Sequence, residues 1–219
     1  MKAVRAVLLA AALVALGPAP DARAHHVGAY APRDNDISMN FKQIKFALRS
    51  ARPDVALRLF ETGAVRTEMR QRADRLPEGL EDAARDALRS ADTGRTEVAL
   101  MVLFAALARD LALEADRQLG DERVPPETRL AAGRRLVEAI WRYYNLIDFV
   151  VTQRDHKAAV GVRLAIDEAE AYVKTEGRGG GGASAAPPSP DRAREPLRRV
   201  AQLLSAVVDE SSPSTRRSS

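Results

Sequence analysis

An apolar run near the middle of the chain, residues 98–108, places the strongest limit on the fold. It is 11 residues long before Arg109 and Asp110 interrupt it, fewer than the roughly 20 that a membrane-spanning helix needs. The run lies inside a longer segment, residues 93–119, and is apolar on nearly every side of a helix. A helix of this kind is buried against neighbours on several sides. We therefore expect an all-α fold, a single helical bundle of about six helices.

Helical periodicity recurs along the rest of the chain, and we find no alternating strand pattern of useful length and no internal repeat of fixed period. Capping residues are also present: Asp34 or Asp36 for the first helix and Asp155 for a late one. Apolar residues at helical spacing predict helices over residues 34–49, 55–61, 64–75, 77–90 and 156–174, and one that begins at Pro125-Pro126 and carries apolar residues to Val150.

The first 24 residues have the pattern of a secretory signal peptide. Lys2 and Arg5 precede an apolar stretch, and Ala22-Arg23-Ala24 provides the small-x-small site that signal peptidase recognises. Cleavage there would make His25 the first residue of the mature chain. The pattern predicts export to the periplasm or the exterior, with no transmembrane segment after cleavage.

Composition divides the remainder into five parts. A short flexible leader, residues 25–33, precedes the predicted bundle at residues 34–176. Residues 177–190 are rich in Gly, Pro and Ser and bury too little apolar surface to fold, which predicts a disordered linker. Beyond it, residues 191–210 predict a tethered amphipathic helix, and residues 211–219 a disordered tail. The linker would let this helix bind a partner, lie on an anionic membrane surface or fold back on the bundle.

The chain has no cysteine, which excludes disulfides, cysteine-ligated zinc, iron–sulfur clusters and a cysteine nucleophile. Its formal net charge of +4 falls on the signal segment and the C-terminal part, which leaves residues 25–176 almost neutral. Proteins that bind nucleic-acid phosphates need a concentrated basic face. We therefore expect no nucleic-acid partner.

Histidine is rare and unevenly placed: of the three in the chain, His25 and His26 directly follow the predicted cleavage site. An amino-terminal histidine carries a free α-amine and an imidazole, a pair that chelates metals, and copper(II) is favoured over other divalent first-row ions. A second imidazole, from His26 or His156, would complete a three-nitrogen site. In this feature the terminus resembles the histidine-brace copper proteins, which are mainly β-sandwiches. The resemblance implies copper as a cofactor; in the alternative interpretation these histidines lie on an unstructured leader and bind nothing in particular.

Carboxylates set among apolar residues form a second group of candidates. Asp148 lies four residues after Tyr144 and seven after Trp141, so these side chains share one face of a helix. Asp110 and Glu114 are also four residues apart, on the central helix. Converging carboxylates hold di-iron sites in ferritin-like bundles, but those sites also use Glu-x-x-His pairs, which this chain lacks. The structural alternative is that each carboxylate pairs with an arginine of the bundle and fixes helix register.

Three aromatic residues, Trp141, Tyr143 and Tyr144, form a local cluster. Trp and Tyr combine apolar area with a polar tip, which suits a ligand-facing surface. Consecutive helix positions point in different directions, so at most two of the three can share a pocket. Ordinary packing at the edge of the core is the alternative.

Together these features predict an exported, non-enzymatic helical-bundle protein that binds a metal ion, copper first, through His25 with help from His26 or His156. One alternative is an interaction module that binds a periplasmic or membrane-associated protein. A second is an enzyme that uses carboxylates and Tyr144 in a bundle pocket.

Overall fold

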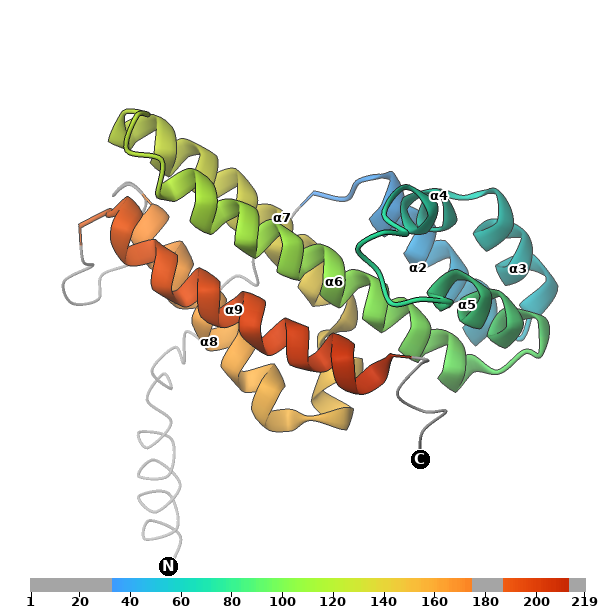
Figure 1. The fold of residues 1–219 in the computed structure, drawn as a ribbon. Helices are drawn as coiled ribbons and strands as arrows, with labels where there is room; N and C mark the ends of the chain where they lie inside the picture. Colours follow the sequence, from blue (N-terminus) through green and yellow to red (C-terminus); the bar gives the residue numbers. More distant parts are fainter. Residues whose placement is uncertain (1–32, 175–186, 213–219) are drawn as a thin grey trace, which may run out of the picture. The chain divides into compact units, whose positions relative to one another are not determined.

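The computed structural model describes residues 33–174 and 187–212 (Figure 1). Within these ranges the protein has eight helices and no strand, which confirms the predicted all-α class. Seven of the described helices lie between residues 34 and 176, one for each helical segment predicted there, although the predicted bundle was described as having about six. The predicted signal peptide, nearly all of the leader, most of the linker and the last seven residues lie outside the described residues.

Four short helices come first: α2 (Asp36–Arg49), α3 (Pro53–Thr62), α4 (Ala64–Gln71) and α5 (Leu80–Arg89). α2 contacts α3 and α4, and α5 contacts α3 and the long helix that follows it. The sequence predicted that α4 would extend to residue 75 and that α5 would begin at residue 77. Both helices are shorter because the chain turns between them, where Gly79 has a left-handed backbone with φ 72°.

Four longer helices form an antiparallel bundle: α6 (Thr93–Leu119), α7 (Pro126–Arg154), α8 (His156–Val173) and α9 (Pro190–Ser211) (Figure 1). Each packs against the next, and α9 closes the ring by packing against α6. The apolar run that predicted a central helix is buried from Ala99 to Ala108. None of the described helices is both long enough and apolar enough to cross a membrane.

An aromatic cluster joins the short helices to the bundle. Phe41 of α2 packs edge-on against Phe104 of α6, with ring centroids 4.7 Å apart, and the Phe104 ring lies 5.6 Å from that of Tyr143 on α7. Asn35 Nδ2 donates a hydrogen bond to the Tyr143 hydroxyl at 2.9 Å. Because all three rings are buried, the two groups of helices share one core.

α2 begins with a capping box whose residues differ from the prediction. Asn35, rather than Asp34 or Asp36, is the N-cap: its Oδ1 accepts a hydrogen bond from Ser38 N, and Ser38 Oγ accepts one from Asn35 N, both at 2.9 Å. Asp155 caps α8 as the sequence predicted. Side-chain oxygens thus satisfy amides at the starts of both helices.

The five-residue sequence Ala-Leu-Arg-Ser-Ala occurs at residues 47–51 and again at 87–91, and it ends α2 and α5 in the same way. In each copy the last alanine has a left-handed backbone, with φ 53° at Ala51 and 54° at Ala91. The next amide donates at 2.9 Å to the carbonyl of the first alanine, the hydrogen bond of a Schellman motif. Two identical segments therefore make two similar helix corners.

α9 packs along α6 and α8, so the C-terminal helix folds back on the bundle instead of being joined to it by the linker alone. At its start Ser189 N donates to Tyr172 O at 2.9 Å, which brings the end of α8 and the start of α9 together. Gly161 of α8 allows a close approach, since a Cβ there would lie 3.1 Å from Leu203 Cδ1. The apolar stripe of α9 is buried, including Leu197, Val200, Leu204 and Val207.

Candidate functional site

The histidines expected to bind a metal are not brought together within the described residues. His25 and His26 lie outside them, and His156 is the first residue of α8, where it is exposed. The described ranges contain no group of three or more His, Asp or Glu side chains placed to hold a metal ion. Copper binding through His25 therefore stays a prediction of the sequence.

Asp148 pairs with an arginine of the neighbouring helix. Arg163 Nη1 donates to both carboxylate oxygens of Asp148, at 2.9 and 2.8 Å, which links α8 to α7. The Asp148 side chain is 29% exposed and that of Arg163 34%. This ion pair is the structural alternative named in the sequence analysis. The enzyme hypothesis requires an Asp148 carboxylate that faces an open cavity, but the carboxylate is paired with the Arg163 guanidinium.

Of the aromatic residues near Asp148, Trp141 and Tyr144 lie beside each other and Tyr143 faces elsewhere. Tyr144 is fully buried, and its hydroxyl donates to Ala159 O at 3.2 Å. Burial, followed by the negative charge of Asp148, raises the pKa of Tyr144 far above its usual range. Trp141 is partly buried, and its indole Nε1 has no hydrogen-bond partner within the described parts of the chain. Tyr143 packs toward α2 and α6 instead, whereas the ring centroids of Trp141 and Tyr144 lie 6.4 Å apart, so two of the three aromatic side chains face the same region.

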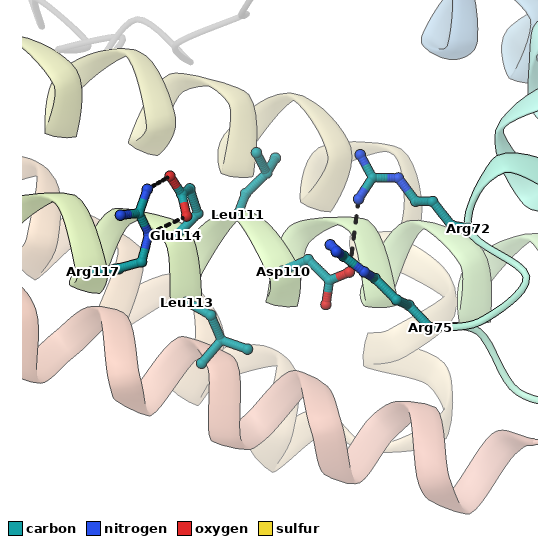
Figure 2. A pocket seen from close by; sticks show the side chains of 7 residues that line it. All are labelled: Arg72, Arg75, Asp110, Leu111, Leu113, Glu114 and Arg117. Atoms are coloured by element: carbon teal, nitrogen blue, oxygen red, sulfur yellow. Dashed lines mark hydrogen bonds and ion pairs between the residues drawn. The ribbon is translucent and has the colours of Figure 1, made fainter.

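Asp110 and Glu114, in contrast, line a groove on the outer face of α6 (Figure 2). The groove has a volume of about 530 Å³ and lies between α6 and the turn that follows α4. Both positive and negative side chains face it. We call it the α6 groove and define it by its lining residues, which are Arg72, Arg75, Asp110, Leu111, Leu113, Glu114 and Arg117.

Glu114 lies toward the C-terminal end of the α6 groove and is held by two neighbours on its own helix. Arg117 donates to its carboxylate through Nε at 2.8 Å and through Nη2 at 2.5 Å, and Gln118 Nε2 donates at 2.6 Å. The hydrogen bonds from Arg117 and then Gln118 lower the pKa of Glu114 to about 2. The carboxylate is therefore ionised at neutral pH, and Arg117 compensates its charge.

Asp110 lies toward the other end of the α6 groove. It accepts a hydrogen bond from Arg109 Nε at 2.9 Å, and Arg72 Nη1 lies 3.8 Å from its second oxygen. Arg109 Nη2 also donates to the Arg75 carbonyl at 3.3 Å, which holds the turn after α4 against α6. The Arg75 side chain is 64% exposed, and Oδ2 of Asp74 lies 3.9 Å from its Nε.

The sequence indicated two carboxylates of the α6 groove but not the arginines around them. Arg117 could have been found, because it lies three residues after Glu114 and such pairs face each other on a helix. Arg72 and Arg75 had no comparable signal, since they reach α6 from the end of a different helix. Their proximity depends on how the turn after α4 packs.

No protein-family model matches this chain, and comparisons with curated proteins and with solved structures find no similar protein. A function must therefore be inferred from the residues of the chain itself.

Proposed function

We propose that this protein is an exported helical-bundle binding module that binds a protein partner through the α6 groove. The groove is the observation that carries the proposal: guanidinium groups, carboxylates and leucines line one concave site with a volume of about 530 Å³. Binding sites are typically concave, with apolar surface and a few placed polar groups that fix orientation.

The state of the charged groups favours binding over acid–base catalysis. A catalytic acid or base works best when its pKa lies near the operating pH. Instead, the pKa of Glu114 is lowered to about 2 by its hydrogen bonds, and burial raises the pKa of Tyr144 above its usual range. Asp148 is held by Arg163. The enzyme alternative therefore has the weaker support.

Export is part of the proposal and rests on the signal pattern of residues 1–24. The partner would then be a periplasmic or extracellular protein, free or membrane-associated. Mass spectrometry of the mature protein from the periplasm or the medium should find His25 as its first residue. A chain that keeps residues 1–24 and stays in the cytoplasm is incompatible with this part of the proposal.

Photocrosslinking in cells tests the binding function. A photoreactive phenylalanine analogue replaces Leu113, which is 51% exposed in the α6 groove. In the matched control it replaces Leu164 of α8, which is 62% exposed. We expect one discrete adduct from position 113 alone, with the attached partner peptide identified by mass spectrometry. No adduct from position 113, or the same adduct from both positions, would overturn the proposal.

Copper binding at the mature amino terminus is a second candidate function, favoured by the placement of His25 and His26 behind the predicted cleavage site. The α-amine and imidazole of His25 would supply two nitrogen ligands. His26 or the exposed His156 would supply a third. Nitrogen sites of this kind favour copper(II).

Calorimetric titration with Cu(II) tests this second function on the chain that begins at His25. The control chain carries one additional Met before His25, which removes the free α-amine from the histidine. Tight binding that the extension abolishes supports the copper site, and variants His26→Ala and His156→Ala identify the third nitrogen. Weak binding that the extension leaves unchanged contradicts it.

A further inference from the structure

The α6 groove presents three kinds of chemical group that together specify a class of ligand. Guanidinium groups donate hydrogen bonds, carboxylates accept them, and leucine side chains offer apolar surface (Figure 2). The inference below rests on the proposed function, because it names the chemistry of the partner that the same groove would bind.

Two arginines of the α6 groove have donors available to a ligand. Arg117 is 66% exposed and contacts Glu114 through Nε and Nη2, so its Nη1 can donate outward. Arg75 is 64% exposed, and its contact with Asp74 at 3.9 Å is at the outer limit for an ion pair. Each of these two guanidiniums can therefore pair with a negatively charged group of a ligand.

The two carboxylates of the groove do not cancel this attraction, because other side chains already compensate them. Glu114 accepts hydrogen bonds from Arg117 and Gln118, and Asp110 accepts one from Arg109. An ionised carboxylate has about four lone-pair positions, so both can still accept an N–H from a ligand.

The size of the groove matches a short peptide. Along α6, the distance from Asp110 to Arg117 is about 10 Å at a rise of ~1.5 Å per residue. An extended peptide covers that distance with about three residues at ~3.4 Å each. Leu113 lies between the two charged positions and is 51% exposed, which offers a contact for one apolar side chain.

We propose that the α6 groove binds a short acidic peptide segment of the partner, which carries two carboxylates and an apolar side chain. The ligand carboxylates pair with Arg75 and Arg117, its apolar side chain packs on Leu113, and its backbone N–H groups donate to Asp110 and Glu114. Nucleic acids and anionic lipid surfaces present mainly phosphate acceptors, which can pair with the arginines but supply no N–H donors to Asp110 and Glu114. A peptide supplies both the acceptors and the donors that this groove requires.

Fluorescence anisotropy with a labelled synthetic peptide that contains both Glu and Leu tests the ligand class on the full mature chain. We expect saturable binding that weakens as salt is added, because the contacts are exposed charges. Matched peptides with Lys in place of Glu, or with Ser in place of Leu, should bind more weakly. If the acidic peptide binds no more tightly than either matched peptide, the proposed ligand class is wrong.

Variants locate the binding on the protein. The double variant Arg75→Ala, Arg117→Ala should lower the affinity for the acidic peptide by about fivefold or more, because two exposed ion pairs are lost. Leu113→Ser, an independent change at an exposed position, should weaken it as well. Arg58→Ala on α3 is the matched control, because Arg58 is 74% exposed and lies outside the groove, and it should leave the affinity unchanged. Affinity that survives both groove variants removes the α6 groove as the site.

Two competitors separate the alternative ligands. The competitors are inorganic phosphate and vesicles of phosphatidylcholine with phosphatidylglycerol. If phosphate displaces the peptide at a similar concentration, the groove binds anions in general; if the vesicles do, it binds a membrane surface. Either result would overturn the proposal. The crosslinking experiment distinguishes the two levels of failure. If position 113 gives an adduct but the acidic peptide does not bind, only the proposed ligand class is wrong. If there is neither an adduct nor peptide binding, the proposed binding function is wrong.

Discussion

Gly63 and Asn40 lie so close together that a Cβ at position 63 would come within 2.2 Å of Asn40 Oδ1. Asn40 is 7% exposed and joins two segments: its Nδ2 donates to Leu59 O, and its Oδ1 accepts from Val65 N, both at 3.0 Å. One side chain of α2 thus holds the corner between α3 and α4. This corner needs both the amide of Asn40 and the absence of a side chain at residue 63.

Removing the amide should therefore destabilise the protein. Asn40→Ala should lower the free energy of unfolding by about 2 kcal/mol, because a buried N–H and a buried carbonyl lose their partner. Gly63→Ala should have at least as large an effect, since the new Cβ would lie 2.3 Å from the backbone carbonyl oxygen of Leu59 as well as overlapping the Asn40 amide. Urea denaturation measures both, with the exposed Gln43→Ala on α2 as the control, expected within about 0.5 kcal/mol of the wild type. Values equal to the control would contradict this account of the corner.

Glycine at the two left-handed alanines should stabilise the protein. Ala51→Gly and Ala91→Gly should each raise the free energy of unfolding by about 0.5–1 kcal/mol, because glycine adopts positive φ without the Cβ penalty. Ala206 lies at an exposed position inside α9, and there the same substitution should lower it by about 1 kcal/mol. Opposite signs in thermal or urea unfolding check the prediction, and a loss of stability at all three positions would refute it.

The docking of α9 can be tested at Leu204, which is fully buried. Leu204→Ala should lower the free energy of unfolding by about 2–4 kcal/mol, because it leaves a cavity within the bundle. The neighbouring Gln202→Ala is exposed and should have little effect. If α9 were joined to the bundle by the linker alone, both substitutions would leave the unfolding transition unchanged.

Acid should weaken the ion-pair network around Glu81, which lies within 3.1 Å of Arg66, Arg70 and Arg85. Burial opposes ionisation, but hydrogen bonds from Arg66 and Arg70 outweigh it and lower the pKa of Glu81 below its ordinary 4.5. Its contribution to stability is therefore fully present above that ordinary value and is lost as the pH falls through the lower folded-state pKa.

Glu81→Gln should accordingly be less stable than the wild type near neutral pH, and the difference should shrink in acid. Urea denaturation near neutral pH and again in acid measures this difference in the free energy of unfolding. Glu122→Gln, at an exposed position in the turn between α6 and α7, is the control and should show little difference at either pH. A difference for Glu81→Gln that stays constant with pH would rule out this linkage.

The helices were largely predictable because side-chain spacing along a helix is a local property. α6 has its predicted bounds, Thr93–Leu119, and Asp155 caps α8 at the predicted position. The prediction was wrong between α4 and α5, because it extended both helices into residues 72–79, where the chain turns. At the start of α2 it selected aspartates, while Asn35 forms the cap because Ser38 can complete the capping box with it.

The candidate site was predictable only in part. Asp110 and Glu114 stood out because they interrupt an apolar helix, but their surroundings did not follow from that pattern. The sequence offered several arginines as partners for Asp148, and the packing of α8 on α7 decided that Arg163 is the one. Arg75 reaches the α6 groove through a turn whose position depends on tertiary packing.

By itself, then, the sequence determined the all-α class, most of the helices and the faces they bury, because helical periodicity and capping act over a few neighbouring residues. Only the tertiary structure decided that α9 packs on α6 and α8, that Asn40 holds a corner between two other helices, and that Arg72 at the end of α4 lies beside Asp110 of α6. These contacts join residues far apart in the chain, and they form only once helix packing has fixed which faces meet.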